Sequence, residues 1–138
     1  MGKTIILDEE YAKVSYMPEY KLVQIIWNGT ITIEQYQRVF TITLDFQEKE
    51  LVPIHNFMSD VRNQGVVNPE NRKWFETYAL PRAVKQGLKR AAVVFDGNIF
   101  KKYYLNLILQ STSRFGMPLR FFSEPNEAIA WFLSVEED

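Results

Sequence analysis

The chain of 138 residues contains no cysteine and only one histidine, His55. Without cysteine it has no disulfides, no thiolate nucleophiles and no cysteine-ligated zinc or iron–sulfur sites. A lone histidine also argues against a histidine-based metal site. We therefore expect neither a metal nor a cofactor.

Long hydrophobic runs are also missing. The longest uninterrupted apolar run, 128–133, has six residues, whereas a membrane helix needs about 20. The N-terminus lacks the basic-then-apolar pattern of a secretion signal, so we expect a cytoplasmic protein. With 46% hydrophobic residues, no internal repeat and no Gly-, Pro- or Ser-rich linker, residues 1–138 are predicted to form one domain.

Charge is unevenly distributed along the chain. Between Arg62 and Arg90, seven basic residues stand against two acidic ones, a net of +5, so the remainder carries −6 to reach the total of −1. A local basic excess on an acidic protein favours an anionic ligand or partner over nucleic acid, which usually binds proteins of basic total charge. A solvated helix face is the alternative explanation.

The first third of the chain predicts a β-hairpin with a lead-in strand, followed by a helix. Three runs have the apolar or alternating character of strands: 4–7, 12–17 and 22–27. The turn of the hairpin falls at 18–21. Thr32 and Gln35 then form a capping-box signature that begins a helix, which we expect to end near Phe46.

Strands and helices alternate in the remainder. Strands are predicted at 54–58, 91–95 and 119–122. Helices are predicted to begin at Asn68, at Asn98 and near Ser123, with a kink or break before Pro81 and ends near Gly87, Ser113 and Leu133. Such alternation predicts an α/β fold, with a mostly parallel sheet covered by about four helices and an N-terminal β-hairpin.

Several groups of residues along the chain form a pattern seen in a known family. They are Trp27-Asn28-Gly29, Asp60-Val61-Arg62-Asn63, Pro69-Glu70 with Trp74, Leu80-Pro81-Arg82-Ala83, Gly87-Leu88-Lys89-Arg90, and Glu127-Ala128 with Trp131-Phe132-Leu133. Together they resemble the SpoIIAA-like family of small bacterial STAS/SEC14-type proteins, related in fold to the anti-sigma-factor antagonists. The resemblance spans nearly the whole chain and implies a sheet wound by successive β–α units. It implies little about activity, because a fold does not fix a function.

The antagonists carry a phosphorylatable serine in the loop after the central strand. Here the corresponding stretch has no Ser or Thr between Asp60 and Asn71, and Ser59 precedes Asp60 instead. This departure argues against switching by phosphorylation. An enzyme is not indicated either: His55 and Asp60, five residues apart on one strand, would lie roughly 16 Å apart. His55 is predicted to be a hydrogen-bonded structural residue.

The predicted binding site is the loop that follows the central strand, at 60–70. Asp60 and Arg62 lie two residues apart, and the helix that begins at Asn68 adds its N-terminal N–H groups and dipole, which favour anions. An Asp–Arg pair that only fastens the loop is the alternative. The predicted ligand-binding residues are Asp60, Arg62, Asn63, Asn68, Arg72 and Lys73.

A partner surface is predicted on the helix that begins at Asn98. Placing residues at 100° intervals assigns Phe100, Tyr104 and Ile108 to the core face. Leu105 and Leu109 then fall on the far side, and two leucines on a solvent face suggest a homodimer or another protein partner. Isolated exposed leucines are the alternative.

We therefore expect a non-enzymatic regulatory or ligand-binding module that acts through residues 60–70 on a small anion or a protein partner. The alternative is a SEC14-like carrier of an apolar small molecule or lipid, held between helices and sheet.

Overall fold

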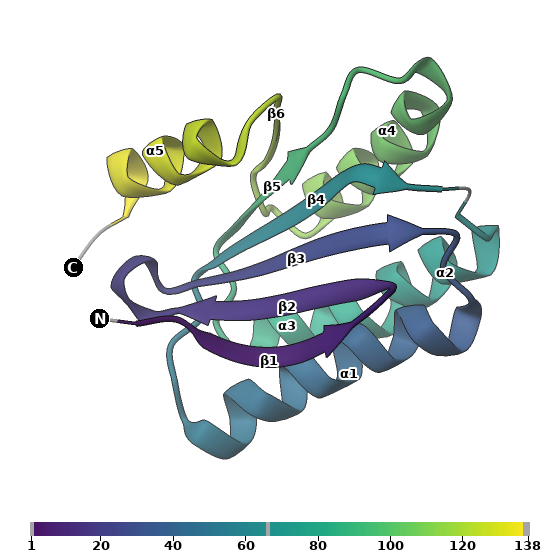
Figure 1. Cartoon of the computed structure of the whole chain (residues 1–138). Coiled ribbons are helices and arrows are strands. Elements are labelled where there is room, and N and C mark those ends of the chain that lie inside the picture. The colour runs from purple at the N-terminus through teal and green to yellow at the C-terminus, as the bar shows by residue number, and fades with distance from the viewer. Residues whose placement is uncertain (1, 66, 137–138) are drawn as a thin grey trace.

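A six-stranded sheet with the strands in sequence order forms the centre of the computed structural model, which describes residues 2–65 and 67–136 (Figure 1). The strands are β1 (Thr4–Glu9), β2 (Ala12–Met17), β3 (Leu22–Gly29), β4 (Asn56–Gln64), β5 (Arg90–Val94) and β6 (Leu119–Phe122). The first two pairings, β1–β2 and β2–β3, are antiparallel, and the other three are parallel. The predicted α/β class, the N-terminal hairpin and the mostly parallel sheet are confirmed.

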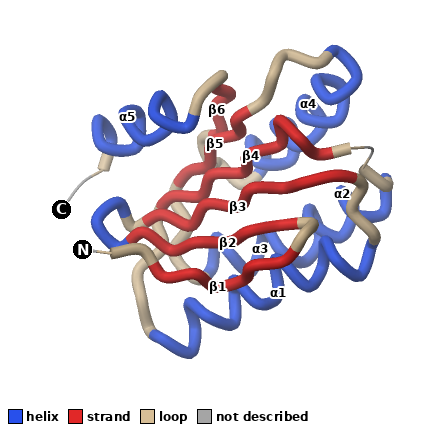
Figure 2. Tube along the Cα trace, viewed as in Figure 1, coloured by secondary structure: helices blue, strands red, loops and turns tan. Residues whose placement is uncertain are grey.

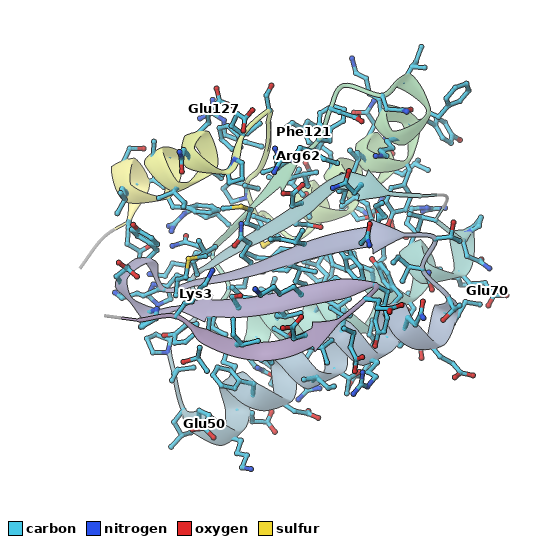
Figure 3. The ribbon with its side chains drawn as sticks, viewed as in Figure 1. Lys3, Glu50, Arg62, Glu70, Phe121 and Glu127 are labelled. Atoms are coloured by element: carbon cyan, nitrogen blue, oxygen red, sulfur yellow. The ribbon has the colours of Figure 1, made fainter. Side chains whose placement is uncertain are left out.

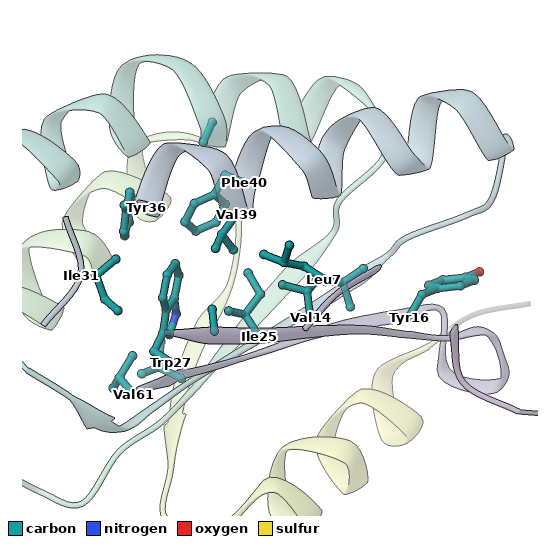
Figure 4. Close-up of a cluster of buried hydrophobic side chains, with 14 of the residues drawn as sticks. Leu7, Val14, Tyr16, Ile25, Trp27, Ile31, Tyr36, Val39, Phe40 and Val61 are labelled. Atoms are coloured by element: carbon teal, nitrogen blue, oxygen red, sulfur yellow. The ribbon is translucent and has the colours of Figure 1, made fainter. Parts of the chain in front are cut away.

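The helices are divided unequally between the two faces of the sheet (Figure 2). They are α1 (Ile33–Glu50), α2 (Pro69–Trp74), α3 (Leu80–Lys85), α4 (Ile99–Arg114) and α5 (Pro125–Val135), with a 3₁₀ turn η1 (Pro18–Tyr20) and a π-helical turn η2 (Phe75–Ala79). Right-handed crossovers between sequential parallel strands place their helices on one face. Among the helices of the described residues, only α5 lies on the other face, as its position across the sheet from α1 shows (Figure 4).

The main core lies between the sheet and the crossover helices (Figure 4). Trp27 from β3 stacks on Tyr36 of α1, with ring centroids 5.3 Å apart. Its indole N–H donates to the Ser59 hydroxyl of β4 at 2.9 Å, which satisfies the one polar group of a side chain that is 1% exposed. Stacking and a satisfied donor together stabilise a buried tryptophan.

The α5 face has a smaller core, because a single helix covers only part of it. Leu22, Met58 and Ala92 from three neighbouring strands pack beneath Ala128 and Phe132 of α5. Towards the hairpin, the same face is less covered, and Ile26 of β3 is 37% exposed. None of the helices within the described residues is long and apolar enough to cross a membrane.

Some predicted boundaries differ from the structure. The first helix, α1, ends at Glu50 and not near Phe46. The central strand does not end at Met58 but continues to Gln64, because its polar residues pair with each other and with β3. Of the kink or break predicted before Pro81, there is no break: a π-helical turn stands there, and the Leu80 N–H donates to the carbonyl of Phe75, five residues back. Such a π-helical turn adds one residue ahead of the proline, whose ring would otherwise collide with the carbonyl four residues earlier.

Candidate functional site

A hollow of about 410 Å³ lies where β4 ends and α4 begins. This is the carboxyl edge of the parallel strands, where α/β proteins usually bind ligands. One wall comes from the end of β4 and the loop after it, and the other from the first turns of α4. The lining residues are Val61, Gln64, Gly65, Val67, Asn98, Phe100, Lys101, Tyr104 and Leu105.

An irregularity in β4 shapes the first wall. The pairing with β3 slips between Asp60 and Asn63, so that Val61 and Gln64, three residues apart, both line the hollow. Such a bulge re-aims side chains at the end of a strand. The N–H of Gly65, the next residue, donates to the Gly29 carbonyl at 2.8 Å. A Cβ at position 65 would come within 2.8 Å of the Thr30 hydroxyl.

Lys101 fastens the second wall to the first. Its ammonium donates to the carbonyl oxygens of Val61 at 2.7 Å and Arg62 at 3.0 Å. The Asp96 carboxylate lies farther away, at 3.9 Å. Asn98 caps α4, its side-chain oxygen accepting from the N–H groups of Phe100 and Lys101. The lining of the hollow thus combines the ammonium group of Lys101 with a largely apolar surface.

An internal cavity of about 80 Å³ lies behind the hollow, between the sheet and the crossover helices. Four residues line both spaces: Val61, Gln64, Tyr104 and Leu105. The cavity walls are mainly aromatic and aliphatic, and the π-helical turn supplies Phe75 and Ala79 to them. π-Helical turns occur frequently at functional sites.

Tyr104, at the junction of the two spaces, lies close to Tyr36 of α1. Burial raises the pKa of Tyr104 to about 12, against the opposing effects of the Tyr36 hydroxyl and the charge of Arg72. Burial also raises the pKa of Tyr36 well above its usual value. Both phenols are therefore neutral at physiological pH and can only exchange hydrogen bonds.

The residues predicted as one anion site are divided between the two faces of the sheet. Asp60 and Arg62 belong to β4, not to a loop, and form a two-point ion pair, with Nε–Oδ1 at 3.0 Å and Nη2–Oδ2 at 2.7 Å. Arg62 also reaches Glu124, which caps α5, at 3.5 Å, so it lies on the α5 side (Figure 3). Its hydrogen bonds to Asp60 raise the pKa of the Arg62 guanidinium.

The other predicted anion-binding residues lie at the start of α2, across the sheet. Asn68 accepts from the Glu70 N–H and caps this helix, as predicted. Arg72 pairs with Glu76 at 3.1 Å, and Glu76 also accepts from the Ser111 hydroxyl of α4. Asn63 and Lys73 are exposed. Because Arg62 and Arg72 stand on opposite faces and each already has a carboxylate, the structure does not bring them into a single site.

The predicted partner surface on α4 was placed on the wrong side of the helix. Leu105 is 3% exposed and belongs to the main core, and Leu109 is half-buried. Phe100, assigned to the core, is 86% exposed. Phe100 lines the hollow opposite the end of β4 and stays exposed there, not packed in the core.

A charged cluster at the opposite edge of the sheet was not predicted from the sequence. Glu136, just after α5, accepts from His55 Nδ1 and Arg90 Nη1, both at 2.6 Å. Lys21 lies 3.6 Å away. The predicted hydrogen bonding of His55 is confirmed. The members of this cluster are far apart in the sequence, from residue 21 to residue 136, so no local motif predicts their contact.

No family model matches the chain, and no curated protein is similar in sequence. Among solved structures, the chain is similar to an uncharacterised protein of the DUF3478 family with a SpoIIAA-like fold, from Shewanella loihica PV-4. The TM-score is 0.54 and the identity 17%, over 95% of this chain and 94% of that one. A likeness at this identity concerns the fold alone. The chain has a SpoIIAA-like α/β fold, as the sequence pattern predicted.

Proposed function

We propose that this chain is a non-enzymatic binding module for a small amphipathic molecule. The apolar body of the ligand would lie along the hollow of about 410 Å³ and extend into the cavity between the sheet and the crossover helices, with its polar end beside Lys101. The observation that carries the proposal is the set of four residues that line both spaces, which places the hollow directly against the apolar interior. The proposal keeps the predicted role of residues 60–70 but assigns them a ligand of the carrier type.

Size and composition support a binding site. Ligand pockets are typically about 300–1,000 Å³, mostly apolar, with a few polar groups that orient the ligand. The hollow of about 410 Å³ falls in this range, and the cavity behind it adds apolar depth. Val61, Val67 and Phe100 supply apolar contact, whereas Gln64 and Asn98 supply amide groups.

The polar groups favour binding over catalysis. Amides neither gain nor lose protons near neutral pH, and the Tyr104 phenol, with a pKa of about 12, stays protonated. Lys101 donates two hydrogen bonds to backbone carbonyls, which leaves one ammonium N–H group. The third can serve Asp96 or an oxygen of a ligand, which favours a carboxylate or phosphate as the polar end.

Native mass spectrometry and a fluorescent fatty acid test the proposal. We expect the purified chain to retain a small molecule, or, once delipidated, to bind cis-parinaric acid saturably with quenching of tryptophan fluorescence, because Trp27 lines the cavity. Ala79→Leu should weaken binding at least tenfold, since Ala79 is 1% exposed and lines the cavity. An empty chain that shows no saturable binding would contradict the proposal.

The matched control is Ala130→Leu, which adds the same side chain at an exposed position of α5 and should leave affinity unchanged. Circular dichroism establishes that both variants fold. If Ala79→Leu does not fold, Ala83→Leu replaces it, because Ala83 lines the same cavity but is only partly buried. A folded cavity variant that binds the probe as tightly as the wild type excludes the cavity as the site.

A further inference from the structure

The first turn of α4 exposes three large apolar side chains next to the hollow. Ile99 is 73% exposed, Phe100 86% and Tyr103 73%. Residues three and four apart on a helix are neighbours, so these side chains form one continuous patch. We call this patch, together with Lys102, the α4 tip. The first turn of α4 lies at the upper right of Figure 1, where the chain arriving from β5 enters the helix.

The charges of this turn are unusual for the start of a helix. It contains no acidic residue but has Lys101 and Lys102, although the helix dipole disfavours cations at this end. Lys101 is compensated by the backbone carbonyls of β4. Lys102 is exposed and has no acidic partner within residues 2–65 and 67–136. An external negative charge would compensate it.

The size of the α4 tip indicates what kind of surface covers it. Two aromatic residues and an isoleucine offer roughly 400 Å² at most, about half of the roughly 800 Å² that each partner contributes to a stable protein interface. Aromatic side chains beside lysine, on a protruding turn, are typical of segments that insert into the headgroup region of a bilayer. A membrane can accept these side chains without a pocket of complementary shape, and its anionic headgroups would balance the charge of Lys102.

We propose that the α4 tip docks the protein reversibly on an anionic bilayer, with Phe100 and Tyr103 inserted at the headgroup level. The hollow then faces the membrane, because Phe100 belongs both to the tip and to the lining of the hollow. Docking does not require the cavity to be occupied. It can therefore succeed or fail independently of the proposed function.

Cosedimentation with vesicles tests the docking. The full chain is mixed with large unilamellar vesicles of phosphatidylcholine, either alone or with roughly one-third phosphatidylglycerol as the anionic lipid. We expect binding to the anionic vesicles, weaker at high salt, and at least a tenfold loss of partitioning in Phe100→Ala/Tyr103→Ala. Lys102→Glu should lose binding to anionic vesicles without a change in circular dichroism.

Two controls separate the tip from general effects. Leu51→Asn removes an equally exposed apolar side chain, 87% accessible at the far end of α1, and should bind vesicles like the wild type. Ala79→Leu, which fills the cavity, should also dock normally. No binding of the wild type to either vesicle overturns the proposal, as does a double variant that binds unchanged. So does a concentration-dependent dimer in gel filtration that the double variant abolishes, since the tip would then join two copies.

Discussion

The carboxylate of Glu136 and the guanidinium of Arg90 approach to 2.6 Å, which joins the end of α5 to the first residue of β5. Both side chains are largely buried, with 15% and 12% exposed. Burial alone would raise the pKa of Glu136, but hydrogen bonds from His55 and Arg90 and their charges outweigh it and lower the pKa to about 2. The contact therefore joins α5, the only helix that residues 2–65 and 67–136 place on this face, to the sheet through an ionised carboxylate.

Stability should depend on the ionisation of Glu136. Because the folded pKa is below the usual value of about 4.5, this group stabilises the fold fully above pH 5, and the contribution disappears as pH falls towards 2. We expect Glu136→Gln to reduce the free energy of unfolding by roughly 2 kcal/mol at pH 7, since it leaves Arg90 without its carboxylate. Urea unfolding should show the difference shrinking at pH 3.

Glu50→Gln provides the matched control, because Glu50 is exposed at the end of α1. It should change stability by less than about 0.5 kcal/mol at either pH. A Glu136→Gln variant as stable as the wild type at pH 7 would show that the cluster does not hold α5.

Features that depend on neighbouring residues were well predicted. Asn68 and Asn98 cap α2 and α4, and Thr32 forms its capping box with Gln35, because a cap is decided within four residues. The runs at 12–17 and 119–122 match β2 and β6. Strand character here comes from alternation or burial, both visible in a short window.

Features that depend on distant residues were not predicted. The polar end of β4 reads as a loop, yet its pairing with β3 and the ion pair of Asp60 with Arg62 make it a strand. On α4, Phe100 was wrongly assigned to the core and Leu105 to the solvent face, whereas Ile108, also assigned to the core, is 6% exposed. The first turn borders the open hollow, and a helical wheel carries no information about such an opening.

We expect the Asp60–Arg62 ion pair to stabilise β4, the strand to which both residues belong. Asp60 is 3% exposed and accepts from the side chain of Arg62 at both oxygens and from its backbone N–H. Asp60→Asn should destabilise the fold by about 2–4 kcal/mol, because it leaves the guanidinium without a buried counter-charge. Arg62→Met, together with the double variant, completes a thermodynamic cycle in urea unfolding, with an expected coupling of about 1–3 kcal/mol. Additive effects would mean that the two residues act separately.

The phenols of Tyr36 and Tyr104 should make the protein sensitive to alkali. The pKa of Tyr104 in the folded state is about 12, above the ordinary value of 10, and burial also raises that of Tyr36. The folded state therefore keeps protons that the unfolded chain loses, so stability is complete below pH 10 and falls as pH rises from 10 to 12. Tyr36→Phe/Tyr104→Phe removes both groups. Its unfolding free energy should fall less between pH 9 and pH 11.5 than that of the wild type, by about 1–2 kcal/mol in urea titrations.

Tyr103→Phe is the control. Tyr103 is 73% exposed, so this substitution should leave the pH dependence of stability unchanged. An alkaline loss of stability as steep in the double phenylalanine variant as in the wild type would mean that these two hydroxyls ionise as freely in the folded protein as in the unfolded chain.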